Sequence, residues 1–247
     1  MARLSVNLNK VALLRNSRRT GVPDVLHFAK LVHSAGAHGV TVHPRPDQRH
    51  IRRSDVPALS ELMRPWRPAF EFNIEGFPDP AFLELIASVK PEQCTLVPDD
   101  PNVFTSEEGW KLDEAQRALI VPTVETLKRQ GSRVILFVDP DPGVVEKVAA
   151  AGADGIEIYT GAYAAAFKEG KHQALLAQCA QTADRAKALG LVVNAGHDLN
   201  LENIPPLVGA IPHLAEASIG HELTADALLM GFEAAVRAYK AALAGAP

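Results

Sequence analysis

Cysteine is scarce in this chain of 247 residues, and its scarcity excludes two kinds of protein. Only Cys94 and Cys179 are present, and they lie in different segments, so we expect neither a disulfide framework nor a C-x-x-C metal site. Long apolar runs are missing too, since none approaches the roughly 20 residues that a membrane-spanning helix needs. Residues 1–10 also lack the apolar stretch of a signal peptide. We therefore expect a cytoplasmic protein with no membrane partner.

Positive charge is not in excess. The chain has 25 lysines and arginines against 29 aspartates and glutamates, which gives a formal net charge of −4. Binding to nucleic acid normally requires a basic face, so no nucleic-acid partner is expected. The first expected strand is not followed by G-x-G-x-x-G, the motif typical of open sheets that bind dinucleotides. This absence disfavours an open doubly wound sheet.

The sequence instead alternates strands and helices along its whole length. With 47% apolar residues the chain can form one large core, and we predict a single domain over residues 1–247. Alternation at a spacing of roughly 30 residues favours parallel strands with helical crossovers. Eight such units predict an α/β fold, a (β/α)8 TIM barrel with extra short helices. The expected strands are residues 4–9, 39–43, 69–76, 94–98, 134–138, 155–161, 192–197 and 217–221, and the expected helices are 23–36, 54–63, 80–89, 113–130, 144–151, 172–189 and 224–243.

The second expected strand runs directly into a loop rich in histidine and arginine. Thr41 and His43 share one face of this strand, and His43 stands at its carboxyl end. Two prolines then end the strand, because proline has no backbone N–H to donate. They place Arg45, Arg49 and His50 on a stiff loop at the mouth of the strand. Since the active sites of (β/α)8 barrels lie at the carboxyl ends of the strands, this stretch is a candidate site.

Polar residues occur at most of the other strand ends. The strand ends, together with the loop after the fourth strand, supply Asn7, His43, Glu75, Thr105, Glu157, His197, Gly220 and His221. Two histidines with a glutamate suit proton transfer on carbonyl substrates, because imidazole titrates near neutral pH. A carboxyl group in a dry site can have its pKa raised toward the same range. The strand ends therefore predict acid–base chemistry.

Two groups of residues indicate that phosphate is bound. Gly196 ends the seventh strand, and Gly220 and His221 follow the eighth, just before an expected helix. Loops in these positions, with a helix N-terminus, form the recurrent phosphate site of such barrels. The carboxylates of Glu222 and Asp226 would oppose an anion there. Four arginines near the mouths of the first two strands could hold a second phosphate: Arg15, Arg18, Arg45 and Arg49.

The same residues leave other functions open. A metal-dependent isomerase or hydrolase is one, but the candidate ligands are dispersed one per strand without H-x-H or H-E-x-x-H spacing, so we predict no metal. An aldolase-like enzyme is another. In that case Lys10, at the end of the first expected strand, would form a Schiff base with a sugar phosphate.

Seven ordered motifs carry a resemblance to a known family: residues 6–18, 39–50, 72–75, 96–98, 156–161, 194–197 and 219–221. In combination they resemble the pyridoxine 5′-phosphate synthase (PdxJ) family of vitamin B6 biosynthesis, over almost the whole chain. The resemblance implies a (β/α)8 barrel, assembled as a homo-octamer, that condenses 1-deoxy-D-xylulose 5-phosphate with 3-amino-2-oxopropyl phosphate. The products are pyridoxine 5′-phosphate, inorganic phosphate and water. No cofactor is implied, because formation of the aromatic ring makes the reaction downhill.

The resemblance also implies roles for individual residues. His43 and Glu75 would accept protons, His197 would donate one, and Glu157 would stabilise charge in the transition state. Substrate-binding roles fall to the residues of the strand ends and their loops. The amino ketone phosphate would be held by Asn7, Arg18, Gly220 and His221, and the deoxyxylulose phosphate by Arg45, His50 and Thr105.

The chain departs from the family pattern at two places. Many members have Asp-His where this chain has Asn9 and Lys10, and a glycine where it has Asp198. We predict that Lys10 contacts a substrate phosphate or hydroxyl group, and that Asp198 supplies only a backbone N–H. Asn9 and Gly196 belong to the same substrate-binding set. A non-catalytic barrel that carries or senses pyridoxine phosphates is a further alternative.

Overall fold

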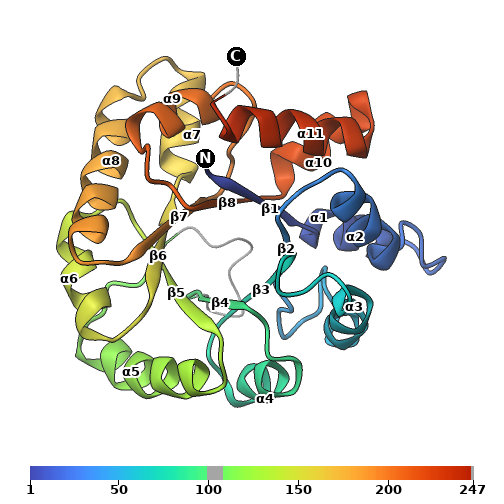
Figure 1. Ribbon diagram of the computed structural model, residues 1–247, viewed down its shortest axis with the longest axis horizontal. Helices are drawn as coiled ribbons and strands as arrows, with labels where there is room; N and C mark the ends of the chain where they lie inside the picture. The colour runs from blue at the N-terminus through green and yellow to red at the C-terminus, as the bar shows by residue number, and fades with distance from the viewer. Residues whose placement is uncertain (99–107, 246–247) are drawn as a thin grey trace.

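Eight parallel strands close into a barrel, as the sequence predicts, in the order β1-β2-β3-β4-β5-β6-β7-β8 (Figure 1). The computed structural model describes residues 1–98 and 108–245, and within these it has the strands β1 (Arg3–Asn7), β2 (Gly39–Val42), β3 (Glu71–Gly76), β4 (Gln93–Leu96), β5 (Arg133–Val138), β6 (Gly155–Tyr159), β7 (Val192–Gly196) and β8 (Glu216–Ile219). The helices in the same residues are α1 (Asn9–Asn16), α2 (Val25–Ser34), α3 (Asp55–Met63), α4 (Pro80–Val89), α5 (Glu114–Arg129), α6 (Pro142–Ala150), α7 (Gly161–Lys168), α8 (Gln173–Ala188), α9 (Ile204–Ala210), α10 (His221–Met230) and α11 (Phe232–Leu243).

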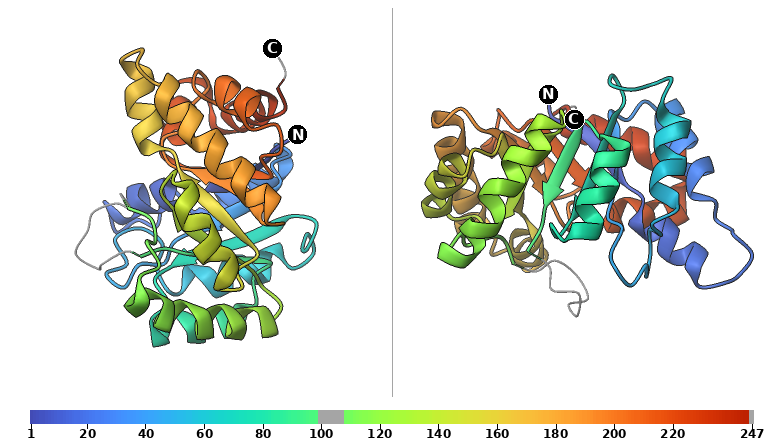
Figure 2. Two further views of the ribbon diagram at one scale, coloured as in Figure 1. Left: turned by 90° about the vertical axis from the view of Figure 1, so that its left-hand side faces the viewer. Right: turned by 90° about the horizontal axis from the view of Figure 1, so that it is seen from below.

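The helices form a layer around the outside of the strands (Figure 2). Val40 and Val42 of β2 are fully buried and belong to the apolar layer between barrel and helices. Thr41 points the other way, because its hydroxyl lies 2.7 Å from the hydroxyl of Ser5 on β1, inside the barrel. The predicted division of β2 into two faces is thus confirmed. None of the helices in the described residues is long and apolar enough to cross a bilayer.

The first strand is shorter than the predicted 4–9. β1 ends at Asn7, and Asn9 opens α1. The side chain of Asn7 accepts a hydrogen bond from the Asn9 N–H at 2.9 Å, a local turn that directs the chain out of the strand and into the helix. Lys10 therefore stands in the first turn of α1, not at a strand end.

The helix predicted over residues 224–243 is two helices. Gly231 lies between α10 and α11 with φ at 84°, a conformation that glycine adopts without steric cost and that interrupts an α-helix. α10 also begins earlier than predicted, at His221.

Two further differences concern β6 and two short helices. The strand predicted over 155–161 ends at Tyr159. The sequence does not predict α7 and α9, because these alanine- and proline-containing segments show no clear apolar period.

Polar side chains occupy the inside of the barrel, where bulky apolar residues are common in this fold. At mid-height, Asn73 donates a hydrogen bond to Thr41 at 3.3 Å and Thr95 donates one to Asn73 at 3.2 Å. Together with the contact between Ser5 and Thr41, these side chains form a chain of hydrogen bonds across four adjacent strands. All four are buried, so the bonds replace those that water would supply.

Charged residues lie inside the barrel near the amino ends of the strands. Glu71 pairs with Arg3 at 3.2 Å and with Arg133 at 2.8 Å. Glu216 accepts a hydrogen bond from Gln93 at 3.1 Å, while its second oxygen has no hydrogen-bond partner among the described residues. Burial, and then repulsion from Glu71, raises the pKa of the Glu216 carboxyl from 4.5 to about 7.

This raised pKa predicts a pH-dependent stability. Because the folded protein binds the Glu216 proton more tightly than the unfolded chain, the contribution is complete below about pH 4.5 and is lost as pH rises through about 7. Glu216→Gln removes the ionisation and keeps an acceptor for Gln93. Its free energy of unfolding, relative to the original protein, should rise by on the order of 1–3 kcal/mol between about pH 5 and about pH 8 in urea titrations. The exposed Glu125→Gln is the control, and an equal difference at both pH values would contradict the assignment.

Candidate active site

A cavity of about 390 Å³ opens at the carboxyl ends of the strands. All but three of the predicted site residues line it. Thr105 lies outside the described residues, Arg18 is exposed on the loop after α1, and Gly196 is buried without lining the cavity. The cavity is thus the place where residues distant in the sequence come together, as the closed ring of strands requires.

His43 and Glu75 face each other at the ends of β2 and β3. The Nδ1 atom of His43 lies 3.9 Å from Oε2 of Glu75. The carboxylate accepts hydrogen bonds from Asn7 at 3.4 Å and from Ser218 at 3.5 Å, so β1 and β8 help to hold it. On the other side, the backbone N–H of His43 donates to the side chain of Asn9 at 2.9 Å. Asn9 therefore fixes the end of β2 to the start of α1.

Burial keeps two imidazoles neutral in this cavity. Burial, and then the charge of Arg45, holds the pKa of His43 well below its ordinary value of 6.5. The same two causes, followed by the charge of Lys10, lower the pKa of His50 to about 4. The Nδ1 atom of His50 accepts a hydrogen bond from the Ile51 N–H at 2.9 Å, which places the ring proton on Nε2. A neutral His43 can accept a proton near pH 7.

Glu157 lies deeper in the cavity, near the end of β6. Burial, followed by repulsion from Glu75 and Glu216, raises the pKa of its carboxyl well above the ordinary 4.5. Its Oε2 atom is buried and has no hydrogen-bond partner among the described residues. A Cβ atom at Gly196 would lie 2.2 Å from Oε1 of Glu157. Gly196 therefore leaves space for this carboxyl group, and its contact with substrate stays a prediction.

His197 and Asp198 follow β7 in an unusual backbone conformation. Their φ angles are 86° and 56°, in the left-handed region that residues other than glycine seldom adopt. The His197 ring lies edge-on to Tyr159, with centroids 5.2 Å apart, and 5.7 Å from Phe137. Aspartate is among the residues that tolerate this region, which explains how Asp198 can stand at a position where glycine is the simpler choice.

The first turn of α10 forms one wall of the cavity. Gly220 is its N-cap, and a Cβ atom there would lie 3.1 Å from Cβ of Asn7. The first N–H groups of a helix have no partner within the helix and, with the dipole, attract anions. Of the two carboxylates expected to oppose an anion, Asp226 accepts a hydrogen bond from Tyr239 at 2.7 Å. Glu222 lines the cavity and lies 3.7 Å from Lys168, whose charge offsets its own.

Cations from the ends of the neighbouring strands β1 and β2 also line the cavity. Lys10, Arg45 and Arg49 all face the cavity. Arg15, by contrast, forms two hydrogen bonds of 2.8 Å with Asp55 and a third with the carbonyl of His50. Arg15 therefore holds the loop after β2 in place, and the interpretation of it as an anion ligand is wrong.

Several cavity residues were missed by the sequence reasoning. Tyr159 stands two residues after Glu157 on β6, and Ser218 stands two before Gly220 on β8, so the two-residue period of a strand could have found both. Leu13 of α1 had no such signal.

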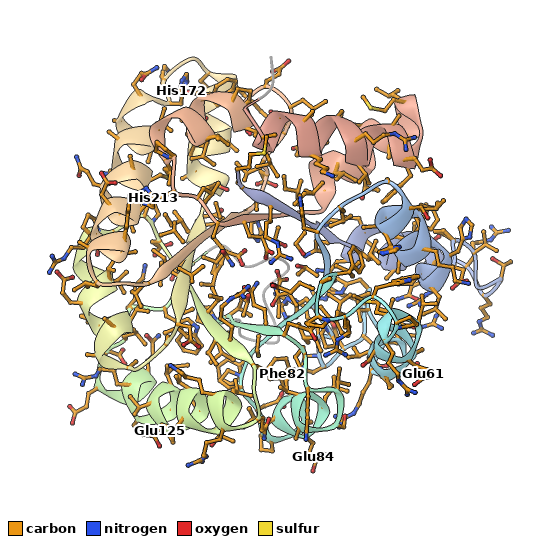
Figure 3. The ribbon with its side chains drawn as sticks, viewed as in Figure 1. Glu61, Phe82, Glu84, Glu125, His172 and His213 are labelled. Carbon is orange, nitrogen blue, oxygen red and sulfur yellow. The ribbon has the colours of Figure 1, made fainter. Side chains whose placement is uncertain are left out.

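The histidines away from the strand ends do not line the cavity. His172 and His213 lie at the periphery of the molecule, outside the barrel (Figure 3). His38 accepts a hydrogen bond from the Leu4 N–H at 3.0 Å. Across residues 1–98 and 108–245, no three histidine, cysteine, aspartate or glutamate side chains are grouped to hold a metal ion.

The chain matches a protein family over nearly its whole length. Residues 4–245 match the family described as "Pyridoxal phosphate biosynthesis protein PdxJ". The chain belongs to the PdxJ family. Among its relatives, a pyridoxine 5′-phosphate synthase of Chelativorans sp. (strain BNC1) is 51% identical over 243 residues, covering 97% of this chain and 98% of the relative. One of Brucella anthropi is 51% identical over 245 residues, covering 98% and 99%.

Solved structures share the fold with this PdxJ-family chain at low sequence identity. Tryptophan synthase from M. tuberculosis superposes with a TM-score of 0.65 at 14% identity, covering 98% of this chain and 93% of that one. Phosphoribosyl anthranilate isomerase superposes with a TM-score of 0.59 at 14% identity, covering 99% and 100%. These likenesses show the barrel fold alone.

The contact between Gly196 and Glu157 predicts that adding one methyl group at residue 196 lowers activity. Gly196→Ala would place a Cβ atom on the Glu157 carboxyl, which must move because it is the end of a flexible side chain. We expect a folded protein whose kcat is lower by on the order of 100-fold in a steady-state assay. Gly209→Ala in α9, where a Cβ atom meets nothing within 4 Å, should leave kcat unchanged. Full activity of Gly196→Ala would show that the place of this carboxyl does not matter.

Proposed function

We propose that this protein is a pyridoxine 5′-phosphate synthase, which condenses 1-deoxy-D-xylulose 5-phosphate with 3-amino-2-oxopropyl phosphate. The observation that carries the proposal is the cavity at the strand ends, where His43, Glu75, Glu157 and His197 share one lining with a helix N-terminus and a group of cations. Two phosphorylated substrates need two anion-binding walls, and the reacting carbons between them need acids and bases. Membership of the PdxJ family and relatives named as this synthase support the same function.

The two walls divide the substrates between them. The N–H groups of the first turn of α10, beside Gly220 and His221, would bind the phosphate of the amino ketone, with Asn7 close by. Lys10, Arg45 and His50 would bind the deoxyxylulose phosphate. This arrangement directs the amine of one substrate toward the ketone of the other, in the space between the walls. Arg18 and Thr105 remain proposed ligands from the sequence resemblance.

The chemistry between the walls is a sequence of proton transfers. The amine attacks the sugar ketone, phosphate and water leave, and an aldol-type closure forms the ring. His43, kept neutral by burial, and Glu75 beside it would accept protons from the reacting carbons and nitrogen. His197, on the opposite side of the barrel mouth, would donate a proton to a leaving oxygen. Several groups are needed because successive steps remove and return protons at different atoms.

Glu157 has a different task. In the empty cavity burial disfavours its ionised form, which raises the pKa of the carboxyl. A positive charge that develops on the substrate nitrogen would favour the ionised form and would be stabilised in return. The unpartnered Oε2 atom is the acceptor available for this contact.

Turnover by variants tests the proposal. Protein stripped of metal should form pyridoxine 5′-phosphate from the two substrates, and His43→Ala, Glu75→Ala and His197→Ala should each lower kcat by at least about 100-fold, because each removes a group that moves a proton. His27→Ala is the control, since this histidine is exposed on α2 and does not line the cavity. Product formation by the original protein would be followed by absorbance. Absence of product from folded protein with intact substrates would overturn the assignment.

A Schiff base at Lys10 is the competing mechanism, since this amine lines the cavity. Borohydride would reduce a covalent imine to a stable adduct, which mass spectrometry detects as added mass on Lys10. We expect no adduct, because the proposed role of Lys10 is a contact with phosphate. An adduct would turn the assignment toward an aldolase-like enzyme.

We further propose that the protein assembles as a homo-octamer and works in the cytoplasm. Leu228 and Leu229 of α10 are 78% and 90% exposed, and Leu14 of α1 is 54% exposed. Apolar side chains of this size in neighbouring helices support an interface between subunits. The phosphates on both substrates keep them from crossing membranes, which supports a cytoplasmic site of action. Light scattering on the purified protein measures the number of subunits.

A further inference from the structure

The backbone of His197 is held in place by a neighbouring side chain. With φ at 86°, followed by 56° at Asp198, two successive residues stand in the left-handed region without being glycine. Such conformations persist only where the surrounding structure fixes them. Asp198 and His197 also face an open cavity, so packing from that side contributes little. Asn203 restrains this backbone from one side by donating a hydrogen bond to the carbonyl of Asp198 at 3.1 Å, and the residue that follows the neighbouring strand β6 restrains it from the other.

The hydroxyl of Thr160 supplies this restraint. Thr160 follows β6 directly and is fully buried. Its Oγ1 atom lies 2.7 Å from the carbonyl oxygen of Gly196 and 2.6 Å from that of His197, so one O–H proton is shared between two acceptors. The backbone N–H of Thr160 also donates to the carbonyl of Gly196, at 2.9 Å. The last peptide of β7 and the peptide that follows it are thus both attached to one residue.

This use of the hydroxyl departs from the usual behaviour of threonine at a helix start. Thr160 is the N-cap of α7, where a threonine side chain ordinarily accepts a hydrogen bond from an N–H group of the first turn. It makes no such bond here. The Thr160 hydroxyl instead donates its proton toward the end of β7, where it contacts the carbonyl of His197, and it does not cap α7.

We propose that Thr160 is a positioning residue for His197: its hydroxyl fixes the strained peptide and thereby holds the imidazole over the reacting atoms. The ring contacts with Tyr159 and Phe137 set the plane of the imidazole, while Thr160 sets the backbone from which it projects. The inference rests on the proposed function, in which His197 donates a proton. A displacement of about 1 Å in such a group is enough to slow a reaction substantially.

Steady-state kinetics of Thr160→Val and Thr160→Ser test the proposal. Valine keeps the shape and removes the donor, so kcat should fall by at least about tenfold while KM for both substrates stays within about threefold. Serine keeps the donor, and its kcat should stay within about threefold of the original. Thr182→Val is the matched control, because Thr182 is also fully buried and donates to a backbone carbonyl, that of Gln178, far from the cavity.

The outcomes separate this inference from the proposed function. Full activity of Thr160→Val, alongside an inactive His197→Ala, would overturn the role of Thr160 and leave that of His197 standing. Full activity of His197→Ala would instead overturn the proposed role of His197 itself. Equal losses in the valine and serine variants would also contradict the proposal, because the hydroxyl would not be the cause. If Thr160→Val does not fold, Thr160→Cys replaces it, since a thiol is a weak donor, with the same expected loss of kcat.

Discussion

A closed ring of parallel strands brings every strand's carboxyl end to the same face of this molecule, and the rest of the structure depends on that closure. His43, Glu75 and His197 are separated by long stretches of sequence, yet they line one cavity. Each of them takes its place from a strand end that neighbouring strands hold in register. The helices complete the arrangement from outside, and α10 turns its N-terminus toward the same cavity. The fold therefore supplies both the acids and bases and an anion-binding wall.

Burial then gives the gathered groups different protonation states. It lowers the pKa of His43, which favours the neutral imidazole that can accept a proton, and it raises the pKa of Glu157, which disfavours the ionised carboxylate. The charge of Arg45 adds to the first effect, and the neighbouring carboxylates add to the second. Pairs of titratable groups with opposite shifts in one cavity are typical of sites that run acid–base chemistry. The position of the Glu157 carboxyl also depends on Gly196, because a side chain at that residue would occupy the same space.

The sequence predicted all eight strands, because period-two alternation and terminating prolines or glycines are local signals, although several strands end before the expected residue. It predicted the position of His43 for that reason. It did not predict that Arg15 pairs with Asp55, since the partner is 40 residues away and only the folded loop brings it near. Nor did it predict α7 and α9, whose short segments lack an apolar period, or the break at Gly231, which depends on a single backbone angle. The role of Thr160 was invisible for a similar reason, because its partner carbonyls belong to the next strand of the barrel.

A crystal structure with 3-amino-2-oxopropyl phosphate bound would test the central claim most directly, which is that one cavity holds both phosphates, one at the start of α10 and one among the cations. The account predicts that the phosphate lies within hydrogen-bond distance of the backbone N–H groups at the start of α10, beside Gly220 and His221. The amine should then point into the space between His43, Glu75 and His197. A phosphate seated instead among Lys10, Arg45 and Arg49, or outside the cavity, would contradict the account.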